Sequence, residues 1–199
     1  MALVRVNNKD KIILDLCGGT GAWSKDYKDN GYDVRVITLP KDDVLTYQPP
    51  NNVYGILSAP PCTMFSLART RAKTPRDFRV GMKIVIACLN IIWDCRYRDK
   101  LAFWVLENPM GYLRQFLGKP AFTFDPYDFG DTYTKKTDLW GYFNIPKKHP
   151  IKSSLDEIAR CKINNRKLPS ISEITGSKQA DRRAITPQGF AKAFYEANR

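Results

Sequence analysis

The constraint that most limits the fold lies in residues 11–31, where a short apolar run, a cluster of glycines and a helical stretch follow one another. The run at 11–16 (KIILDL) has the length and composition of a strand buried in a parallel sheet. Three glycines between 18 and 21 then allow a tight turn, and the pattern at 22–30 predicts a helix. Strand, glycine turn and helix form the first unit of a doubly wound fold, and the free amides at such a helix start can hold a ligand.

The rest of the chain continues this alternation. Further strands are expected at 34–39, 53–57 and 101–106, and short antiparallel strands within 122–143. Long helices are expected at 78–98 and 188–197. These elements predict an α/β fold with a doubly wound, mostly parallel sheet and an antiparallel hairpin at one edge. The buried side of the first long helix is expected to comprise Val80, Ile84, Ala87, Cys88, Ile91 and Ile92.

A chain of 199 residues fits one domain with a small appendage. We expect a core at 1–144, a small basic region at 145–183 with one weak helix at 155–161, and a last segment at 184–199. The helix of that last segment carries Phe190, Ala193 and Phe194 on one face and is expected to pack back on the core near the first strand.

The cysteines and the single histidine restrict the chemistry. Five cysteines are widely spaced without a CxxC pair, and His149 is the only histidine, so neither a disulfide framework nor a structural zinc site is expected. A reducing, cytoplasmic compartment fits this pattern. The start of the chain lacks the features of a signal peptide, and no run approaches the roughly 18 apolar residues of a membrane helix.

The formal charge of +12 favours a polyanionic partner, although a generally basic protein would show the same total. The distribution of the cations is more informative than their number. Six of them follow Cys62 within about twenty residues: Arg69, Arg71, Lys73, Arg76, Arg79 and Lys83. Residues 67–77 lack apolar periodicity and are interpreted as a mobile loop, so the polyanion is expected to be the substrate itself.

Cys62 directly follows the strand at 53–57 and the rigid turn formed by Pro60 and Pro61. In an α/β sheet, ligands bind beyond the carboxyl ends of the strands, so a thiol held there is a candidate nucleophile. The alternative is a buried structural cysteine, since free cysteine often acts as a small apolar residue. Glu107 follows the strand at 101–106 and should face the same crevice, where low polarity can raise the pKa of its carboxyl group.

Three motifs occur in the order found in one enzyme family. They are Asp15-Leu16-Cys17-Gly18-Gly19-Thr20-Gly21, then Pro61-Cys62 followed by Phe65-Ser66, then Glu107-Asn108-Pro109. Together they resemble the cytosine carbon-5 DNA methyltransferases, class I enzymes that use S-adenosylmethionine, in a short form similar to phage-type members. The resemblance covers residues 11–140 and thins after 145.

The resemblance implies methyl transfer from S-adenosylmethionine to carbon-5 of cytosine in DNA, duplex or single-stranded, through a covalent cysteine adduct. It implies no metal and a cytoplasmic location in a bacterial or virus-infected cell. The implied catalytic residues are Cys62 and Glu107. The implied cofactor-binding residues are Asp15, Leu16, Gly19, Thr20, Gly21, Asp43, Val44 and Pro60. The implied nucleic-acid contacts are Arg69, Arg71, Lys73, Arg76 and Lys135.

The chain departs from the family pattern at several positions. Cys17 stands where members often carry phenylalanine, and Thr38 stands where an acidic residue usually holds the ribose, a role that could pass to Asp42. Lys135 and Thr137 replace the two arginines of a Gln-x-Arg-x-Arg motif, and lysine lacks the bidentate fork of arginine. The region after 145 is also short for target recognition, so a separate specificity or restriction partner could complete it.

Three alternatives therefore stay open at the level of sequence. The chain could methylate cytosine in RNA, or act on a free pyrimidine nucleotide, which its basic surface disfavours. It could also be a nucleic-acid-binding protein that keeps the fold without the activity. The altered residues favour this last alternative, whereas intact Cys62 and Glu107 oppose it.

Overall fold

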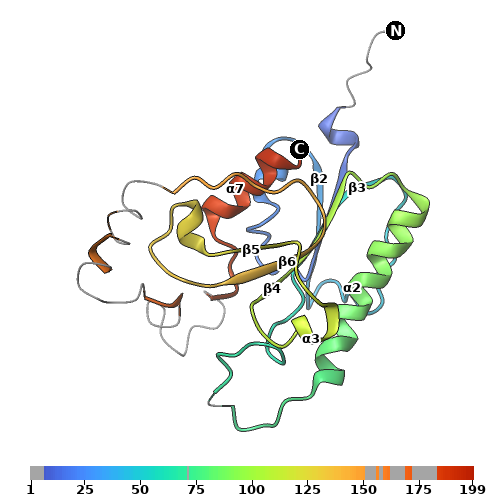
Figure 1. Ribbon diagram of the computed structural model, residues 1–199. Coiled ribbons are helices and arrows are strands. Elements are labelled where there is room, and N and C mark those ends of the chain that lie inside the picture. Colours follow the sequence, from blue (N-terminus) through green and yellow to red (C-terminus); the bar gives the residue numbers. More distant parts are fainter. Residues whose placement is uncertain (1–6, 71, 151–155, 157–158, 162–168, 172–182) are drawn as a thin grey trace.

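The computed structural model describes residues 7–70, 72–150, 156, 159–161, 169–171 and 183–199. These residues form one mixed sheet of six strands in the order β2-β1-β3-β4-β6-β5 (Figure 1). The parallel strands are β1 (Ile12–Leu16), β2 (Asp33–Ile37), β3 (Val53–Ser58) and β4 (Phe103–Pro109). Strand β6 (Thr137–Tyr142) runs antiparallel to β4 and to β5 (Phe122–Phe124). The expected α/β class, with a mostly parallel sheet and an antiparallel pair at one edge, is confirmed.

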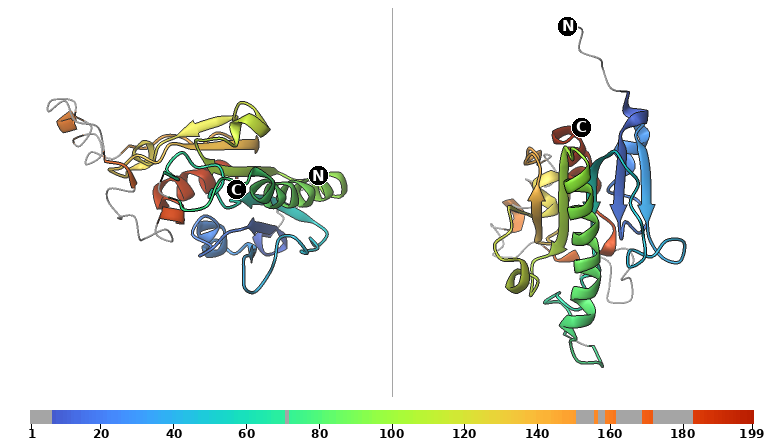
Figure 2. Two further views of the ribbon diagram at one scale, coloured as in Figure 1. Left: turned by 90° about the horizontal axis from the view of Figure 1, so that it is seen from below. Right: turned by 90° about the vertical axis from the view of Figure 1, so that its right-hand side faces the viewer.

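Helices cover both faces of the sheet. The long helix α2 (Phe78–Arg98) stands in front of the strands in the right-hand view of Figure 2, and its Cys88, Ile91 and Ile92 pack on Leu14, Leu16 and Ile56. The short helix α1 (Lys25–Asp29) and the C-terminal helix α7 (Gln188–Ala197) share the other face. Short helical segments complete the set: η1 (Asn8–Asp10), α3 (Arg114–Leu117) and η2 (Pro126–Phe129).

Helix α7 confirms its predicted bounds and its predicted buried face, since Phe190, Ala193 and Phe194 are all buried. Phe190 stacks on Phe124 of β5, with ring centroids 3.9 Å apart, and both Phe190 and Phe194 contact Trp23, which lies just before α1. The helix therefore packs against the segment that follows β1, as expected from its apolar face.

The bounds of α2 also match the prediction, but its buried side is rotated. Val80 is 56% exposed, and Ile84 and Ala87 are only half-buried, whereas Gly81, Val85 and Cys95 are buried. The reason is the close packing of Gly81 on the segment after β3: a Cβ there would lie 2.8 Å from the Phe65 ring. This contact turns the helix so that residue 81 rather than residue 80 faces the core.

Several predicted boundaries differ from those in the structure. Residues 19–24 form turns, so α1 begins at Lys25 rather than at residue 22, and β2 ends at Ile37 rather than at residue 39. Strand β4 continues through Pro109 because β6 pairs with it along its whole end, so Glu107 lies inside a strand and not beyond it.

Most of the basic region expected at 145–183 lies outside the described residues, but residues 156 and 159–161 of the weak helix expected at 155–161 are described and are helical. In the part of the chain that the structure describes, no helix has the length and apolar character needed to cross a bilayer.

Candidate active site

The parallel strands place two loops side by side. From β1 the chain moves to β2 on one side, whereas β3 and β4 lie on the other, so the order of the strands reverses between β1 and β3. Crevices for ligands form at such a point, beyond the carboxyl ends of the strands. Leu16 of β1 is in register with Ser58 of β3, and the amide of Ala59 donates to the carbonyl of Leu16 at 2.9 Å. The glycine turn and the loop that carries Cys62 therefore leave the sheet next to each other.

Asp15 lies directly beneath the glycine turn and is fully buried. Its Oδ2 accepts a hydrogen bond from Ser24 Oγ at 2.6 Å, whereas its Oδ1 has no partner. Burial raises the pKa of Asp15 to about 6, although the hydrogen bonds from Ser24 act in the opposite direction. A Cβ at Gly18 would lie 2.4 Å from the carboxyl carbon of Asp15, so this position of the turn requires glycine.

The outer part of the turn is open. Gly19 and Gly21 have φ angles of +55° and +71°, in the left-handed region that glycine tolerates best, and a Cβ at Gly19 would meet no atom within 4 Å. A pocket of about 560 Å³ lies beside the turn. Its walls are Gly19, Thr20, Val34, Arg35, Val36, Ile37, Thr38, Lys41, Asp42 and Tyr47.

The remaining residues expected at the cofactor site lie in different surroundings. Leu16 and Val44 are buried in the apolar layer beneath α2. Asp43 accepts a hydrogen bond from the amide of Leu45 at 2.9 Å, and Asp42 rather than Asp43 is among the residues that form the pocket wall. Pro60 is buried at the exit of β3.

The loop after β3 is fixed by groups from several elements. Asn108 Nδ2 of β4 donates to the carbonyl of Pro60 at 2.9 Å. The carbonyl of Cys62 accepts from the amides of Phe65 and Ser66 at 2.9 and 2.8 Å, which closes a compact turn. The carbonyl of the buried Phe65 accepts a hydrogen bond from the amide of Tyr112 at 2.9 Å. Cys62 is half-buried within this framework.

Arg76 is part of the same framework. Its guanidinium donates to the carbonyls of Met64 and Ser66 at 3.0 and 2.8 Å and lies 4.9 Å from the ring centroid of Tyr112. Two N–H groups of Arg76 thus donate to the backbone of the Cys62 loop. From the sequence, Arg76 is expected to contact nucleic acid, and this position is not predicted.

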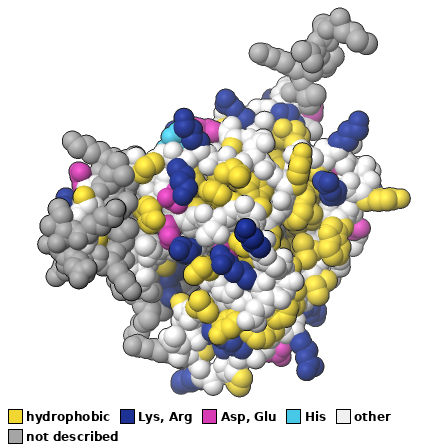
Figure 3. Space-filling model, in the orientation of Figure 1, with side chains coloured by type: hydrophobic (Ala, Val, Ile, Leu, Met, Phe, Trp, Pro, Cys, Tyr) yellow, Lys and Arg dark blue, Asp and Glu magenta, His cyan; other side chains and the backbone are white. Residues whose placement is uncertain are grey.

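The other cations of this segment differ from Arg76. The guanidinium of Arg69 donates to Thr74 Oγ1 at 2.8 Å, and Lys73 is exposed. Arg71 lies outside the described residues. Figure 3 shows Lys and Arg side chains spread over the face drawn there, with few acidic side chains between them.

Glu107 and Lys135 both affect the pKa of Cys62, and Lys135 also affects that of Glu107. Burial raises the pKa of Cys62, and the carboxylate of Glu107 raises it further, whereas Lys135 and then Arg183 lower it. Burial also raises the pKa of Glu107, Lys135 lowers it, and Asp138 raises it. The structure therefore brings together the predicted thiol and carboxyl groups and the cation of Lys135.

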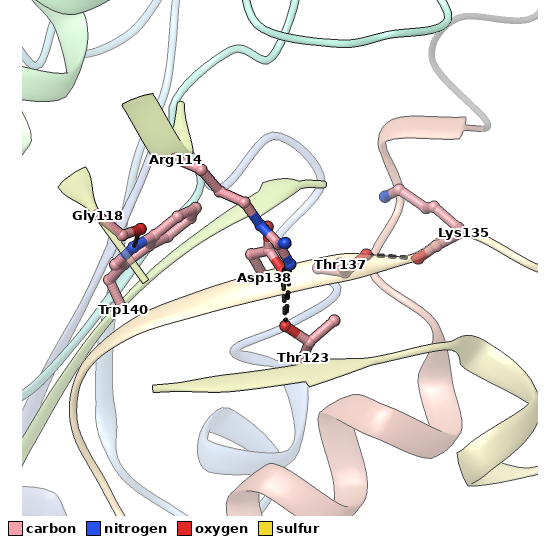
Figure 4. A network of polar contacts seen from close by, with 7 residues as sticks. All are labelled: Arg114, Gly118, Thr123, Lys135, Thr137, Asp138 and Trp140. Carbon is pink, nitrogen blue, oxygen red and sulfur yellow. Dashed lines mark hydrogen bonds and ion pairs between the residues drawn. The ribbon is translucent and has the colours of Figure 1, made fainter. Parts of the chain in front are cut away.

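Lys135 is held by its backbone. Its amide donates to Asp125 Oδ1 at 3.1 Å, and its carbonyl accepts from Thr137 Oγ1 at 2.7 Å. In Figure 4 its side chain extends back toward the pair formed by Arg114 and Asp138. Thr137 thus anchors the segment that presents Lys135.

A polar network supports β6 beside this site. The carboxylate of Asp138 is fully buried and accepts two hydrogen bonds from Arg114, both at 2.6 Å, and one from Thr123 Oγ1 at 2.7 Å (Figure 4). Such a bidentate pair has a defined geometry as well as a favourable energy. Because Asp138 raises the pKa of Glu107, the network also affects the candidate acid.

Sequence reasoning missed several of these groups. Ser24, Asp138 and Arg183 influence the candidate site, yet none lies in a motif. Asn108 lies in a motif, but its role in holding Pro60 depends on two strands being neighbours. The alternation of strands and helices along the chain could have suggested that these two strands are neighbours, and hence that Asn108 lies close to Pro60.

Comparisons with known proteins add no family to this description. No family model matches the chain, and a search of curated proteins finds no match. Within the described residues, no group of three or more His, Cys, Asp and Glu side chains could hold a metal ion.

Proposed function

We propose that the protein transfers a methyl group from S-adenosylmethionine to carbon-5 of cytosine in DNA, through a covalent adduct with Cys62. The observation that carries this proposal is that Ser58 at the end of β3 is paired with Leu106 of β4, and that Asn108 Nδ2 donates to the carbonyl of Pro60 at 2.9 Å, so the loop of Cys62 leaves the sheet beside Glu107. The reversal of strand order beside the glycine turn supports a Rossmann-like core of the class I methyltransferase type.

The residues around the glycine turn fit S-adenosylmethionine. The turn backbone at Gly19 is open, the adjacent pocket of about 560 Å³ is large enough for a nucleoside, and the buried Oδ1 of Asp15 lacks a partner. Thr38 and Asp42 line the pocket and would hold the ribose hydroxyl groups in place of the usual acidic residue. When bound, S-adenosylmethionine supplies an electrophilic methyl group.

The protein's own part in the reaction is to make carbon-5 of cytosine nucleophilic. The thiolate of Cys62 adds to carbon-6 of the base, and Glu107 gives a proton to the ring nitrogen N3, so that electron density moves to carbon-5. Burial raises the pKa of Glu107, which favours the protonated carboxyl group that this step requires.

The charges of the two groups are linked. A negative Glu107 disfavours the thiolate of Cys62, so a protonated Glu107 makes that thiolate easier to form. During the addition the sulfur loses its charge as Glu107 gains one, and the site carries one negative charge throughout. Lys135, which lowers both pKa values, is placed to balance that charge.

The target base must leave the duplex stack to reach Cys62, at a cost of a few kcal/mol that single-stranded DNA avoids. The decisive experiment measures transfer of radiolabelled methyl from S-adenosylmethionine to duplex DNA, single-stranded DNA, RNA and deoxycytidine monophosphate. We expect incorporation into DNA that Cys62→Ser abolishes and that Cys95→Ser, at a buried cysteine of α2, retains.

Three outcomes would contradict the proposal in different ways. Incorporation into RNA alone would reassign the substrate, and incorporation into the free nucleotide alone would exclude a nucleic-acid enzyme. Binding of DNA without transfer to any acceptor, together with no calorimetric binding of S-adenosylmethionine, would identify a non-enzymatic nucleic-acid-binding protein.

A further inference from the structure

Two cysteines outside the proposed catalytic pair are in contact. The sulfur atoms of Cys17 and Cys88 lie 4.0 Å apart, although 71 positions separate the two residues. Cys17 is the residue that leaves β1 for the glycine turn, and Cys88 lies in the middle of α2. The contact therefore joins the turn to the helix that covers this face of the sheet.

The two thiols differ in access and in charge. Cys17 is half-buried, whereas Cys88 is fully buried. The contact with Cys17 lowers the pKa of Cys88, whereas the same contact, burial and the neighbouring carboxylates of Asp15 and Asp43 raise the pKa of Cys17. A peroxide that reaches the half-buried Cys17 therefore meets a sulfur whose potential disulfide partner lies only 4.0 Å away.

The two sulfurs must come closer before a bond can form between them. A disulfide requires an S–S distance of about 2.05 Å, so the sulfurs must approach by roughly 2 Å. Cys17 has a φ of +58°, a conformation that a residue with a side chain seldom adopts, and its amide donates to the carbonyl of Ile37 at 2.8 Å. Cys88 is buried in the middle of α2, whereas Cys17 lies at the half-buried start of the turn, so we expect most of this approach to come from the turn.

We propose that Cys17 and Cys88 form an oxidisable dithiol site, which a peroxide closes to a disulfide that ties the glycine turn to α2. In this step the peroxide oxygen–oxygen bond breaks, the two thiols together lose two electrons and two protons, and two water molecules form. The sulfur that reacts first with the peroxide becomes a sulfenic acid. The second thiol then attacks this sulfenic sulfur and displaces its oxygen as water. The disulfide alters the turn that begins at Cys17.

The oxidation of Cys17 and Cys88 does not depend on the proposed function. Only the expected effect of the disulfide on cofactor binding rests on that function. If S-adenosylmethionine binds at the glycine turn, the disulfide should lower the affinity for the cofactor, and bound cofactor should slow the oxidation of Cys17. If the cofactor binds elsewhere, the disulfide should form with no such coupling.

The test treats the full chain with graded hydrogen peroxide, blocks the remaining thiols, and maps the peptides by mass spectrometry. We expect the count of free thiols to fall from the five in the sequence to three, one linked peptide pair carrying residues 17 and 88, and full reversal by a phosphine reductant. Cys17→Ser and Cys88→Ser should each abolish the linked pair, whereas Cys95→Ser, at a buried cysteine two turns along α2, should retain it.

Oxidation of Cys17 to a sulfinic acid without a linked pair, or a disulfide that contains Cys62 instead, would overturn the proposal. Calorimetry with S-adenosylmethionine on the reduced and oxidised chain completes the test. A linked pair with unchanged cofactor affinity would refute the placement of the cofactor at this turn and leave the dithiol site standing. Cofactor binding without any linked pair would refute the dithiol site alone.

Discussion

The buried carboxyl group of Asp15 should make the protein less stable at neutral pH than a neutral side chain of the same shape. The informative change is Asp15→Asn, which preserves size and removes the charge. Ser24 Oγ, now 2.6 Å from Asp15 Oδ2, can donate equally well to an amide oxygen. The second atom of the amide would occupy the place of Asp15 Oδ1, which has no partner now.

The magnitude follows from the pKa of Asp15, which burial raises from 3.8 to about 6. The folded protein then binds the proton more tightly than the unfolded chain does. Its stability is therefore greatest below pH 4 as far as this group is concerned, falls as pH rises from about 4 to 6, and stays lower above that. A shift of about two units corresponds to roughly 3 kcal/mol. Asparagine does not titrate, so the variant should lack this loss.

Urea denaturation of both proteins, followed by tryptophan fluorescence at several pH values from 4 to 8, measures the effect. The stability of Asp15→Asn relative to the natural protein should rise by about 3 kcal/mol over this range, whatever fixed offset the amide introduces. Asp10→Asn, at an exposed carboxylate, is the matched control and should show no such rise. A difference in stability between the two proteins that does not change with pH would refute the reasoning, because the pKa of Asp15 would then be the same in the folded and the unfolded chain. The stabilised variant should also bind S-adenosylmethionine more weakly.

Three further predictions concern the loops around the sheet ends. Cys62→Ser should abolish the covalent adduct with DNA that contains 5-fluorocytosine, which gel electrophoresis under denaturing conditions would reveal, and an adduct that survives would exclude Cys62 as nucleophile. Replacing Arg69 and Lys73 with alanine should flatten the slope of log affinity against log salt for duplex DNA by roughly 2 units, whereas Arg76→Ala should leave that slope unchanged and alter the rate at which iodoacetamide alkylates Cys62. The opposite assignment of these two effects would mean that Arg76 contacts phosphate. Gly18→Ala should destabilise the fold in urea by several kcal/mol, since its Cβ would lie 2.4 Å from a buried carboxyl carbon, and an unchanged midpoint would show that the turn can move aside.

The sequence predicts those elements whose signal is local. Helix α2 begins after Asp77, whose side chain accepts from the amides of Arg79 and Val80, and its apolar period continues to its end. The end of β4 is different, because residues 107–109 become a strand only through pairing with β6. No pattern within 101–109 indicates how far a strand some thirty positions later will accompany it, so that boundary needed the structure.

The same distinction applies to the candidate site. Cys62 and Glu107 could be predicted to be neighbours, because Cys62 follows β3, Glu107 lies near the end of β4, and the two parallel strands end at one edge of the sheet. The role of Arg76 could not, since its guanidinium meets two carbonyls only after the loop at 62–66 has folded back. Arg183 reaches the electrostatic environment of Cys62 from 121 positions away, a distance that no local pattern encodes.

The way in which the Cys62 loop is held bears on how selective its thiol would be. Asn108, Tyr112 and Arg76 each hold a different carbonyl or pair of carbonyls of that loop, so its position does not depend on a bound substrate. A nucleophile placed in advance saves the entropic cost of ordering it during the reaction. Yet burial and Glu107 raise the pKa of Cys62, so the free thiol stays protonated and weakly reactive. Placement and reactivity are thus separated. The fold holds the Cys62 thiol in position at all times. Its reactivity, in contrast, requires a neutral Glu107 and nearby positive charge, conditions that a base in contact with Cys62 and Glu107 would meet.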